Sequence, residues 1–395
     1  MASADLESLI TERRIIICVG SGGVGKTTTA AALALAAARA GRKALVLTID
    51  PARRLANSLG LDTLDHTERR IADDKIAAPG ASGESPGMEL ATAPVTGSLH
   101  AMMLDQKQAF DEIVAEYATD PAQRARILGN RIYQQISSTL TGAHEYAAMA
   151  KLYALVREGR YDLIVLDTPP TANALDFLDS PEKVAAAIDS PALQWLIKPY
   201  LETGHFSLKL VGIGGAFILK QIAKFVGSRF LEDMAQFVAE FNTVLGGFRE
   251  RAKAVGELLR KPEVAFVLVS GPDTLSVEEA VSFHRRLRDQ SLPLGGFVVN
   301  RIHPPGPAAP DRAALLELLE GRPELRGYAP DDLVQVASDL DRTYRDFQSL
   351  AAMDAASVAR LRAVAGSAPL VEVPLFDHDI HDMDGLSLIG RYLVV

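Results

Sequence analysis

The sequence feature that most constrains the fold is a glycine-rich segment near the amino terminus, Gly20–Thr27 (GSGGVGKT). It fits the pattern G-x-x-x-x-G-K-[S/T]. The apolar run Arg14–Val19 precedes it and a helical pattern over Lys26–Ala40 follows it. Glycines allow backbone N–H groups to converge on phosphate oxygens, and the amino end of the helix attracts the same anion. The segment therefore predicts a phosphate-binding loop between a strand and a helix.

Two side chains of this loop have expected roles at a nucleotide. The ammonium group of Lys26 reaches the β- and γ-phosphates in such loops, and the hydroxyl of Thr27 is a ligand of Mg²⁺. A chance match in a glycine-rich turn is disfavoured, because the strand and the helix stand in the required order. We therefore predict that the chain binds ATP or ADP with Mg²⁺. The predicted contacts in the loop are Gly20, Gly22, Gly23, Val24, Gly25, Lys26, Thr27 and Thr28.

Short apolar runs without alternation are typical of buried parallel strands. Such runs occur at Arg14–Val19, Lys43–Ile49, Tyr161–Leu166, Val264–Ser270, Gly295–Asn300 and Leu370–Pro374. Helical patterns separate them. This alternation predicts an α/β fold with a doubly wound, mostly parallel sheet covered by helices on both faces, as in P-loop NTPases.

Unequal spacing between these runs predicts an inserted subdomain. The intervals Asp50–Tyr161 and Phe177–Pro262 are longer than one crossover helix requires. Helical patterns within them cover Gln106–Tyr117, Ala143–Arg157 and Phe230–Leu259. We predict an ATPase core formed by residues 1–75, 160–180 and 262–395, and a discontinuous helical subdomain formed by residues 88–159 and 181–261.

Two carboxylates stand at the ends of predicted strands. Asp167 follows Leu163–Leu166 and suits a role in holding a water molecule bound to Mg²⁺. Asp50 ends another strand and is placed to orient or deprotonate the attacking water. Each could instead cap a following helix, but the presence of both favours the functional interpretation. We predict Asp50 and Lys26 as catalytic residues, and Thr27, Asp50 and Asp167 as residues of the Mg²⁺ site.

Composition narrows the possible partners and the compartment. The net charge of −9 argues against general binding of nucleic acid. Cys18 is the single cysteine, so one chain forms no internal disulfide and no cysteine-based metal cluster, and we expect this thiol to pack in the core. Met1–Thr11 is no secretory signal, and no apolar run reaches the roughly 20 residues of a membrane span. We therefore expect a cytoplasmic protein.

Several motifs occur in an order and spacing that a known family shares. They are Gly20–Thr28 (GSGGVGKTT), Asp50–Ala52 (DPA), Asp167–Leu178 (DTPPTANALDFL), Val298–Arg301 (VVNR) and Val373–Phe376 (VPLF). Together they resemble the group of dimeric, deviant-P-loop ATPases that contains the arsenite-pump ATPase (ArsA) and the ATPases that target tail-anchored proteins. The resemblance covers nearly the whole chain, and it is greatest to bacterial members whose role is poorly defined.

The resemblance implies further roles. Asp50 would be the switch I carboxylate that activates water, and Asp167 would begin switch II, in which Pro169, Pro170 and Thr171 move on hydrolysis. Outside the loop, Asn300 would hydrogen-bond the adenine, and Pro374, Leu375 and Phe376 would pack against its ring. Arg301, next to Asn300, is a further implied contact of the nucleotide. The family implies an ATP-hydrolysing dimeric switch that couples nucleotide state to a partner-binding helical subdomain. A regulatory subunit with weak hydrolysis, or an energising subunit of a membrane transporter, are the alternatives.

One loop position departs from the family pattern. A second lysine, which in the family reaches across the dimer to the partner's nucleotide, is replaced by Ser21. A hydroxyl carries no charge, so stabilisation of the transition state from the partner would be weakened or lost. Three explanations stay open. Arg53, Arg54 or Arg301 substitutes for it, a companion subunit supplies the lysine, or hydrolysis is slow.

The resemblance also sets expectations for partners. We expect a homodimer, or a heterodimer with a related ATPase subunit. A hydrophobic protein segment or a membrane protein is the possible client, and nucleic acid is not expected. Because only Cys18 is present, neither an interfacial zinc site nor thiol-bound arsenite is expected.

Two further segments have competing interpretations. The apolar stretch Phe206–Ser228 either packs within the helical subdomain, which we favour, or presents a face to a client or a membrane surface. Asp377–Asp384 (DHDIHDMD) alternates carboxylates and imidazoles. We expect a solvated or capping loop there rather than a metal site, because neighbouring residues of one loop rarely converge on an ion.

Overall fold

The computed structural model describes residues 6–49, 54–77, 96–139, 143–168, 186, 228–307 and 312–394. Several predicted features lie outside these residues: Asp50, Arg53, Pro169, Pro170, Thr171 and residues 206–227 of the apolar stretch. Within the described part of the chain, no helix combines the length and the apolar character needed to cross a membrane.

The described residues form one sheet with the strand order β3-β4-β2-β5-β1-β6-β7-β8. Its strands are β1 (Ile15–Val19), β2 (Lys43–Thr48), β3 (Arg69–Arg70), β4 (Ser98–Met103), β5 (Leu163–Asp167), β6 (Val264–Ser270), β7 (Leu294–Ile302) and β8 (Leu370–Pro374). Neighbouring strands are parallel, except that β3 runs antiparallel to β4. The predicted α/β fold with a mostly parallel sheet is confirmed.

The central strands are apolar on both faces because helices cover both faces. In β1, Ile15 and Ile17 belong to one buried cluster and Ile16 and Cys18 to the other. Cys18 is fully buried, as predicted. Successive side chains of a strand point to opposite faces, so a continuous apolar run is what a fully covered strand requires.

One helical layer is centred on α2 (Lys26–Arg39), which packs against α16 (Met383–Leu393). The short helices α1 (Glu7–Glu12), α3 (Arg54–Ser58) and α4 (Asp73–Ile76) complete this layer. Ten of the fourteen residues of α2 are buried, including a run of alanines. Small side chains allow this helix to lie close to the sheet behind the phosphate-binding loop.

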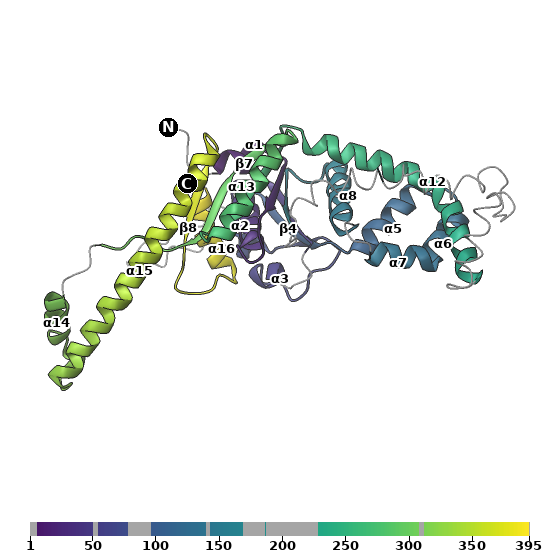
Figure 1. Cartoon of the computed structure of the whole chain (residues 1–395). Helices are drawn as coiled ribbons and strands as arrows, with labels where there is room; N and C mark the ends of the chain where they lie inside the picture. Colours follow the sequence, from purple (N-terminus) through teal and green to yellow (C-terminus); the bar gives the residue numbers. More distant parts are fainter. Residues whose placement is uncertain are drawn as a thin grey trace.

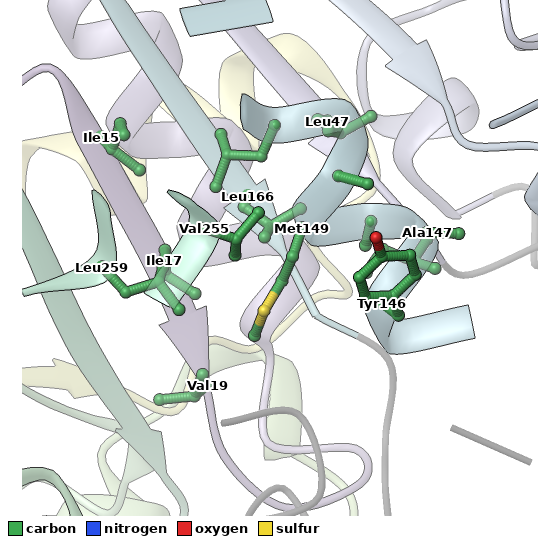
Figure 2. Close-up of a cluster of buried hydrophobic side chains, with 14 of the residues drawn as sticks. Ile15, Ile17, Val19, Leu47, Tyr146, Ala147, Met149, Leu166, Val255 and Leu259 are labelled. Carbon is green, nitrogen blue, oxygen red and sulfur yellow. The ribbon is translucent and has the colours of Figure 1, made fainter. Parts of the chain in front are cut away.

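The other layer consists of α8 (Ala143–Glu158), α12 (Ser228–Leu259), α13 (Thr274–Asp289) and the carboxyl-terminal part of α15 (Pro330–Ala365). Figure 2 shows part of its core, in which Met149 of α8 and Val255 of α12 lie with β1 side chains. Further from the sheet, α5 (Gln106–Tyr117), α6 (Pro121–Gly129) and α7 (Arg131–Thr139) pack with α8 and α12 (Figure 1). These helices fall inside the intervals predicted for the helical subdomain, whose boundaries stay a prediction.

A long helical arm extends from the opposite side of the molecule (Figure 1). It consists of α14 (Arg312–Glu320), the short 3₁₀ helix Pro323–Leu325 and the amino-terminal part of α15, which has 36 residues in total. The other end of α15 packs on α13 and β7. The arm is thus continuous with a helix that contacts the sheet.

Candidate nucleotide-binding site

The glycine-rich loop lies where strand β1 ends and helix α2 begins. Strand β1 sits between β5 and β6, and ligands of open parallel sheets bind outside the carboxyl ends of the strands. Gly20, Gly23 and Gly25 have φ values of +155°, +78° and +98°. Such values favour glycine, because other residues are strained there. The local sequence therefore permits the loop conformation that the motif predicts.

Neighbouring strands also leave no room for side chains at two of these glycines. A Cβ atom on Gly20 would lie 1.9 Å from the carbonyl oxygen of Val269, and one on Gly25 would lie 2.3 Å from Nδ2 of Asn300. The loop is therefore packed against the ends of β6 and β7 rather than projecting freely into solvent.

The Lys26 ammonium group lies against its own loop. Nζ of Lys26 donates to the carbonyl oxygens of Gly20, at 2.9 Å, and of Ser21, at 2.6 Å. Lys26 is only 6% exposed. The positive charge is therefore held at the loop, where the motif predicts the β- and γ-phosphates.

Two residues predicted for the Mg²⁺ site are in direct contact. Thr27 Oγ1 donates to Oδ2 of Asp167 at 2.7 Å, and Thr48 Oγ1 donates to the same oxygen at 2.9 Å. Asp167 is fully buried at the end of β5. Burial, and to a smaller degree the Asp167 carboxylate, raises the pKa of the Cys18 thiol, so that side chain stays uncharged. The Thr27 hydroxyl and the Asp167 carboxylate both offer hard oxygen ligands, which fit Mg²⁺.

Asn300 reaches the loop from the end of β7, with Arg301 next to it. Asn300 Nδ2 donates to the carbonyl oxygen of Val24 at 3.0 Å, and Asn300 Oδ1 accepts from the backbone N–H of Arg301 at 3.0 Å. Asn300 is 9% exposed. In this structure its amide group therefore fixes the position of the loop, while the predicted contact with adenine stays a prediction.

A cavity of about 540 Å³ brings most of the predicted residues together. Those that line it are Gly23, Gly25, Lys26, Thr27, Thr28, Asn300, Arg301, Pro374, Leu375 and Phe376. Gly20, Gly22 and Val24 belong to the same loop without lining the cavity, and Asp167 lies behind Thr27. The size and the lining suit a nucleotide.

Comparison with known proteins places the chain in a family. The model of the family described as "Anion-transporting ATPase" matches residues 13–314. The chain belongs to the anion-transporting ATPase family. The resemblance predicted from the motifs is confirmed.

Curated relatives of the anion-transporting ATPase family are similar over most of the chain. A protein of Aquifex aeolicus, provisionally named as an arsenical pump-driving ATPase, is 24% identical over 306 residues, which are 77% of this chain and 67% of the relative. The ATPase get3 of Aspergillus terreus is 24% identical over 304 residues, 75% of this chain and 76% of the relative. ATPase GET3C of Arabidopsis thaliana is 25% identical over 304 residues, 75% of this chain and 68% of the relative.

Part of the cavity lies beyond the residues that the anion-transporting ATPase model matches. Pro374–Phe376 and the following loop residues His378, Asp379, Ile380 and His381 line it, although the match ends at residue 314. The loop was expected to be solvated or capping. Asp382 does cap α16, since its side chain accepts from the N–H of Gly385 at 2.8 Å, and no metal-binding cluster occurs within the described residues. Its contribution to the cavity was not predicted.

Further residues of the site were also not predicted. Asn57, Ser58, Thr168 and Ile389 line the cavity. Thr168 Oγ1 donates to the carbonyl oxygen of Cys18 at 2.8 Å, which joins the ends of β5 and β1. Arg54, considered from the sequence only as a substitute for the missing lysine, also lines it. The hydroxyl of Ser21 is buried and finds no hydrogen-bond partner among the described residues.

Proposed function

We propose that this chain binds ATP with Mg²⁺ and hydrolyses it to ADP and phosphate. The observation that carries the proposal is the contact between Thr27 and Asp167 at the end of the loop that holds the Lys26 ammonium group. These groups come from the loop and from a neighbouring parallel strand, and they supply the cation and the oxygen ligands that phosphoryl transfer uses. Membership of the anion-transporting ATPase family supports the same chemistry.

Each residue has a separate part in the proposed reaction. Lys26 binds the β- and γ-phosphates, Thr27 provides a hydroxyl ligand, and Asp167 orients that ligand or a water molecule of the metal. Bound Mg²⁺ would neutralise charge on the phosphate oxygens. Asp50 orients or deprotonates the attacking water. Asn300, Arg301 and Pro374–Phe376 bind the nucleoside end.

Arg54 is the favoured replacement for the family lysine whose position Ser21 occupies, because Arg301 is assigned to the nucleoside end. Arg54 lines the cavity, and a guanidinium group offers several N–H donors to phosphate oxygens. In that case each chain supplies its own cation to the nucleotide, whereas in the family pattern a lysine of the partner subunit supplies it. A heterodimer with a lysine-bearing subunit is the second explanation.

We further propose that the chain acts as a dimeric switch. ATP and ADP would favour different arrangements of the segments that follow β2 and β5. The segment after β5 leads in sequence into the predicted helical subdomain. The relatives named arsenical pump-driving ATPase and get3 support a role that couples nucleotide to another protein. The partner would be a hydrophobic protein segment or a membrane protein.

Turnover of MgATP by the purified chain tests the hydrolysis. Asp50→Asn should reduce kcat by about 100-fold or more, because it removes the proposed base, while the Kd for ADP changes by less than about threefold. Asp62→Asn is the matched control, since Asp62 is exposed and does not line the cavity. Absence of turnover from the wild-type chain, alone and with a companion subunit, would reject the ATPase and leave the regulatory nucleotide-binding subunit.

A further inference from the structure

The end of strand β7 contains an unusual backbone conformation at the cavity. Asn300 pairs with Val373 of β8 and Ile302 pairs with Pro374, so Arg301 is an extra residue in β7. Arg301 has a φ of +64°, a left-handed conformation that a residue with a Cβ atom adopts only when its surroundings hold it there. β-Bulges of this kind redirect side chains at functional sites.

On the amino-terminal side, this bulge is fixed to the phosphate-binding loop. The Asn300 side chain accepts from the Arg301 N–H and donates to the carbonyl oxygen of Val24. A shift of the bulge would therefore move Asn300 and with it the loop.

On the carboxyl-terminal side, the bulge is fixed to helix α15. Asp354 Oδ2 accepts from the backbone N–H of His303 at 2.8 Å and lies 2.7 Å from Nδ1 of the same residue. Asp354 is only 7% exposed. The His303 ring also meets Phe347 of α15 edge-on, with ring centroids 5.5 Å apart. Hydrogen bonds to a buried carboxylate are strong and directional, so His303 has one defined position.

We propose that Asp354 is a positioning residue for nucleotide binding. By fixing His303, it keeps Arg301 in the left-handed conformation, and it thereby places Asn300 beneath the loop and Arg301 at the cavity. Asp354 itself lies outside residues 13–314, the part that the family model matches, and it does not line the cavity. The inference rests on the proposed nucleotide site and adds a residue that acts on that site from a helix behind it.

Two substitutions at Asp354 test this role. Asp354→Ala removes both hydrogen bonds, and Asp354→Asn keeps the shape with a weaker acceptor, which serves if the alanine variant does not fold. We expect the Kd for MgADP and the KM for ATP to rise about tenfold or more for Ala, the effect of losing a hydrogen bond to a charged group, and less for Asn. The kcat should fall less than the affinity does, because Lys26 and Thr27 are linked to the bulge indirectly, through Asn300 and the Val24 carbonyl, and Asp167 belongs to β5. Asp346→Asn is the matched control on the same helix, where Asp346 is exposed.

Repeating the Asp354 substitution in an Arg301→Gly chain separates a positioning role of Asp354 from a general loss of stability. Glycine adopts a positive φ without strain, so in an Arg301→Gly chain the bulge no longer depends on Asp354. There, Asp354→Ala should weaken MgADP binding by less than about threefold, measured against Arg301→Gly alone. An equal loss of MgADP affinity in both backgrounds would contradict the proposal. So would a wild-type affinity in both Asp354→Ala and Asp354→Asn, measured at a temperature at which both variants are folded. Failure of the wild-type chain itself to bind MgADP would reject the nucleotide site instead.

Discussion

The side-chain amide of Asn300 occupies the space that any side chain on Gly25 would need. Nδ2 of Asn300 would lie 2.3 Å from a Cβ atom at Gly25, and the same nitrogen donates to the carbonyl oxygen of the preceding residue, Val24, at 3.0 Å. The phosphate-binding loop is thus shaped by its own glycines and also by a residue that follows it by more than two hundred positions in the sequence.

Gly25→Ala should therefore weaken nucleotide binding. Alanine is strained by about 1–2 kcal/mol at a left-handed φ, and it would displace the Asn300 amide, so we expect the Kd for MgADP to rise about tenfold or more. Equilibrium titration with a fluorescent ADP analogue measures the change. Gly246→Ala should leave the affinity unchanged, since among the described residues no atom outside the local backbone of α12 lies within 4 Å of the new Cβ. Wild-type affinity in Gly25→Ala would show that the loop tolerates displacement of Asn300.

Thr27→Val should abolish the effect of Mg²⁺ on ATP affinity. The substitution removes the hydroxyl that contacts Asp167 at 2.7 Å and keeps the size of the side chain. We expect the ratio of the Kd for ATP in EDTA to the Kd in Mg²⁺ to fall toward about one, since the ligand is lost. Thr343→Val on α15, where the exposed hydroxyl donates to the backbone carbonyl of Asp339, is the control. A Mg²⁺ dependence like that of the wild type would remove Thr27 from the metal site.

Arg54→Ala should slow hydrolysis more than it weakens binding. If Arg54 supplies the cation missing at Ser21, kcat should fall about 1,000-fold or more, as for other cations that stabilise the transferring phosphoryl group. The Kd for MgADP should change by less than about threefold. Single-turnover measurements of phosphate release separate the two quantities. Arg326→Ala on the exposed arm is the control, and an unchanged kcat in Arg54→Ala would transfer the role to another residue.

Stability should depend on pH through His100 in strand β4. Burial of the ring, and next the nearby Lys43 ammonium, lowers the pKa of His100 below its usual value of 6.5. The unfolded chain therefore binds a proton more readily than the folded chain does. The contribution of this residue to stability is present above pH 6.5 and is lost as the pH falls from there toward the folded-state pKa.

His100→Asn should reduce that pH dependence. Urea unfolding at about pH 7.5 and about pH 5.5 gives the free energy of unfolding at each pH, and the decrease between them should be smaller in the variant than in the wild type. The difference in slope is the relevant quantity, because the variant also loses the edge-on contact of His100 with Tyr161. Identical slopes in the variant and the wild type would contradict the assignment.

The buried strands were predictable because their apolar runs reflect local composition. Strands β1 and β6 were found within one residue of their predicted limits, since helices cover both of their faces. Asp167, predicted to follow a strand, is instead the last residue of β5. Strand β4, which pairs with the short edge strand β3, was not predicted. Ser98 and His100 interrupt the apolar pattern of β4.

The remainder of the candidate site depends on contacts between distant segments. The loop motif identified Lys26 and Thr27, because their roles follow from local spacing. The contact of Asn300 with Val24 required the strand order, which no local pattern contains. The alternating Asp and His residues of Asp377–Asp384, after β8, led to the prediction of a solvated or capping loop. Their place at the cavity follows from the path of the chain between β8 and α16.

The position of β8 has a practical consequence for anyone who trims this chain to the stretch shared with its family. A protein that ended at residue 314 would retain every residue of the phosphate-binding loop. It would lack β8, which pairs with β7 from Phe297 to Ile302. Strand β7 would then become an unprotected sheet edge with open N–H and C=O groups, a template for pairing with other chains. Such a protein should aggregate during expression, and its insolubility would say nothing about whether the loop binds a nucleotide.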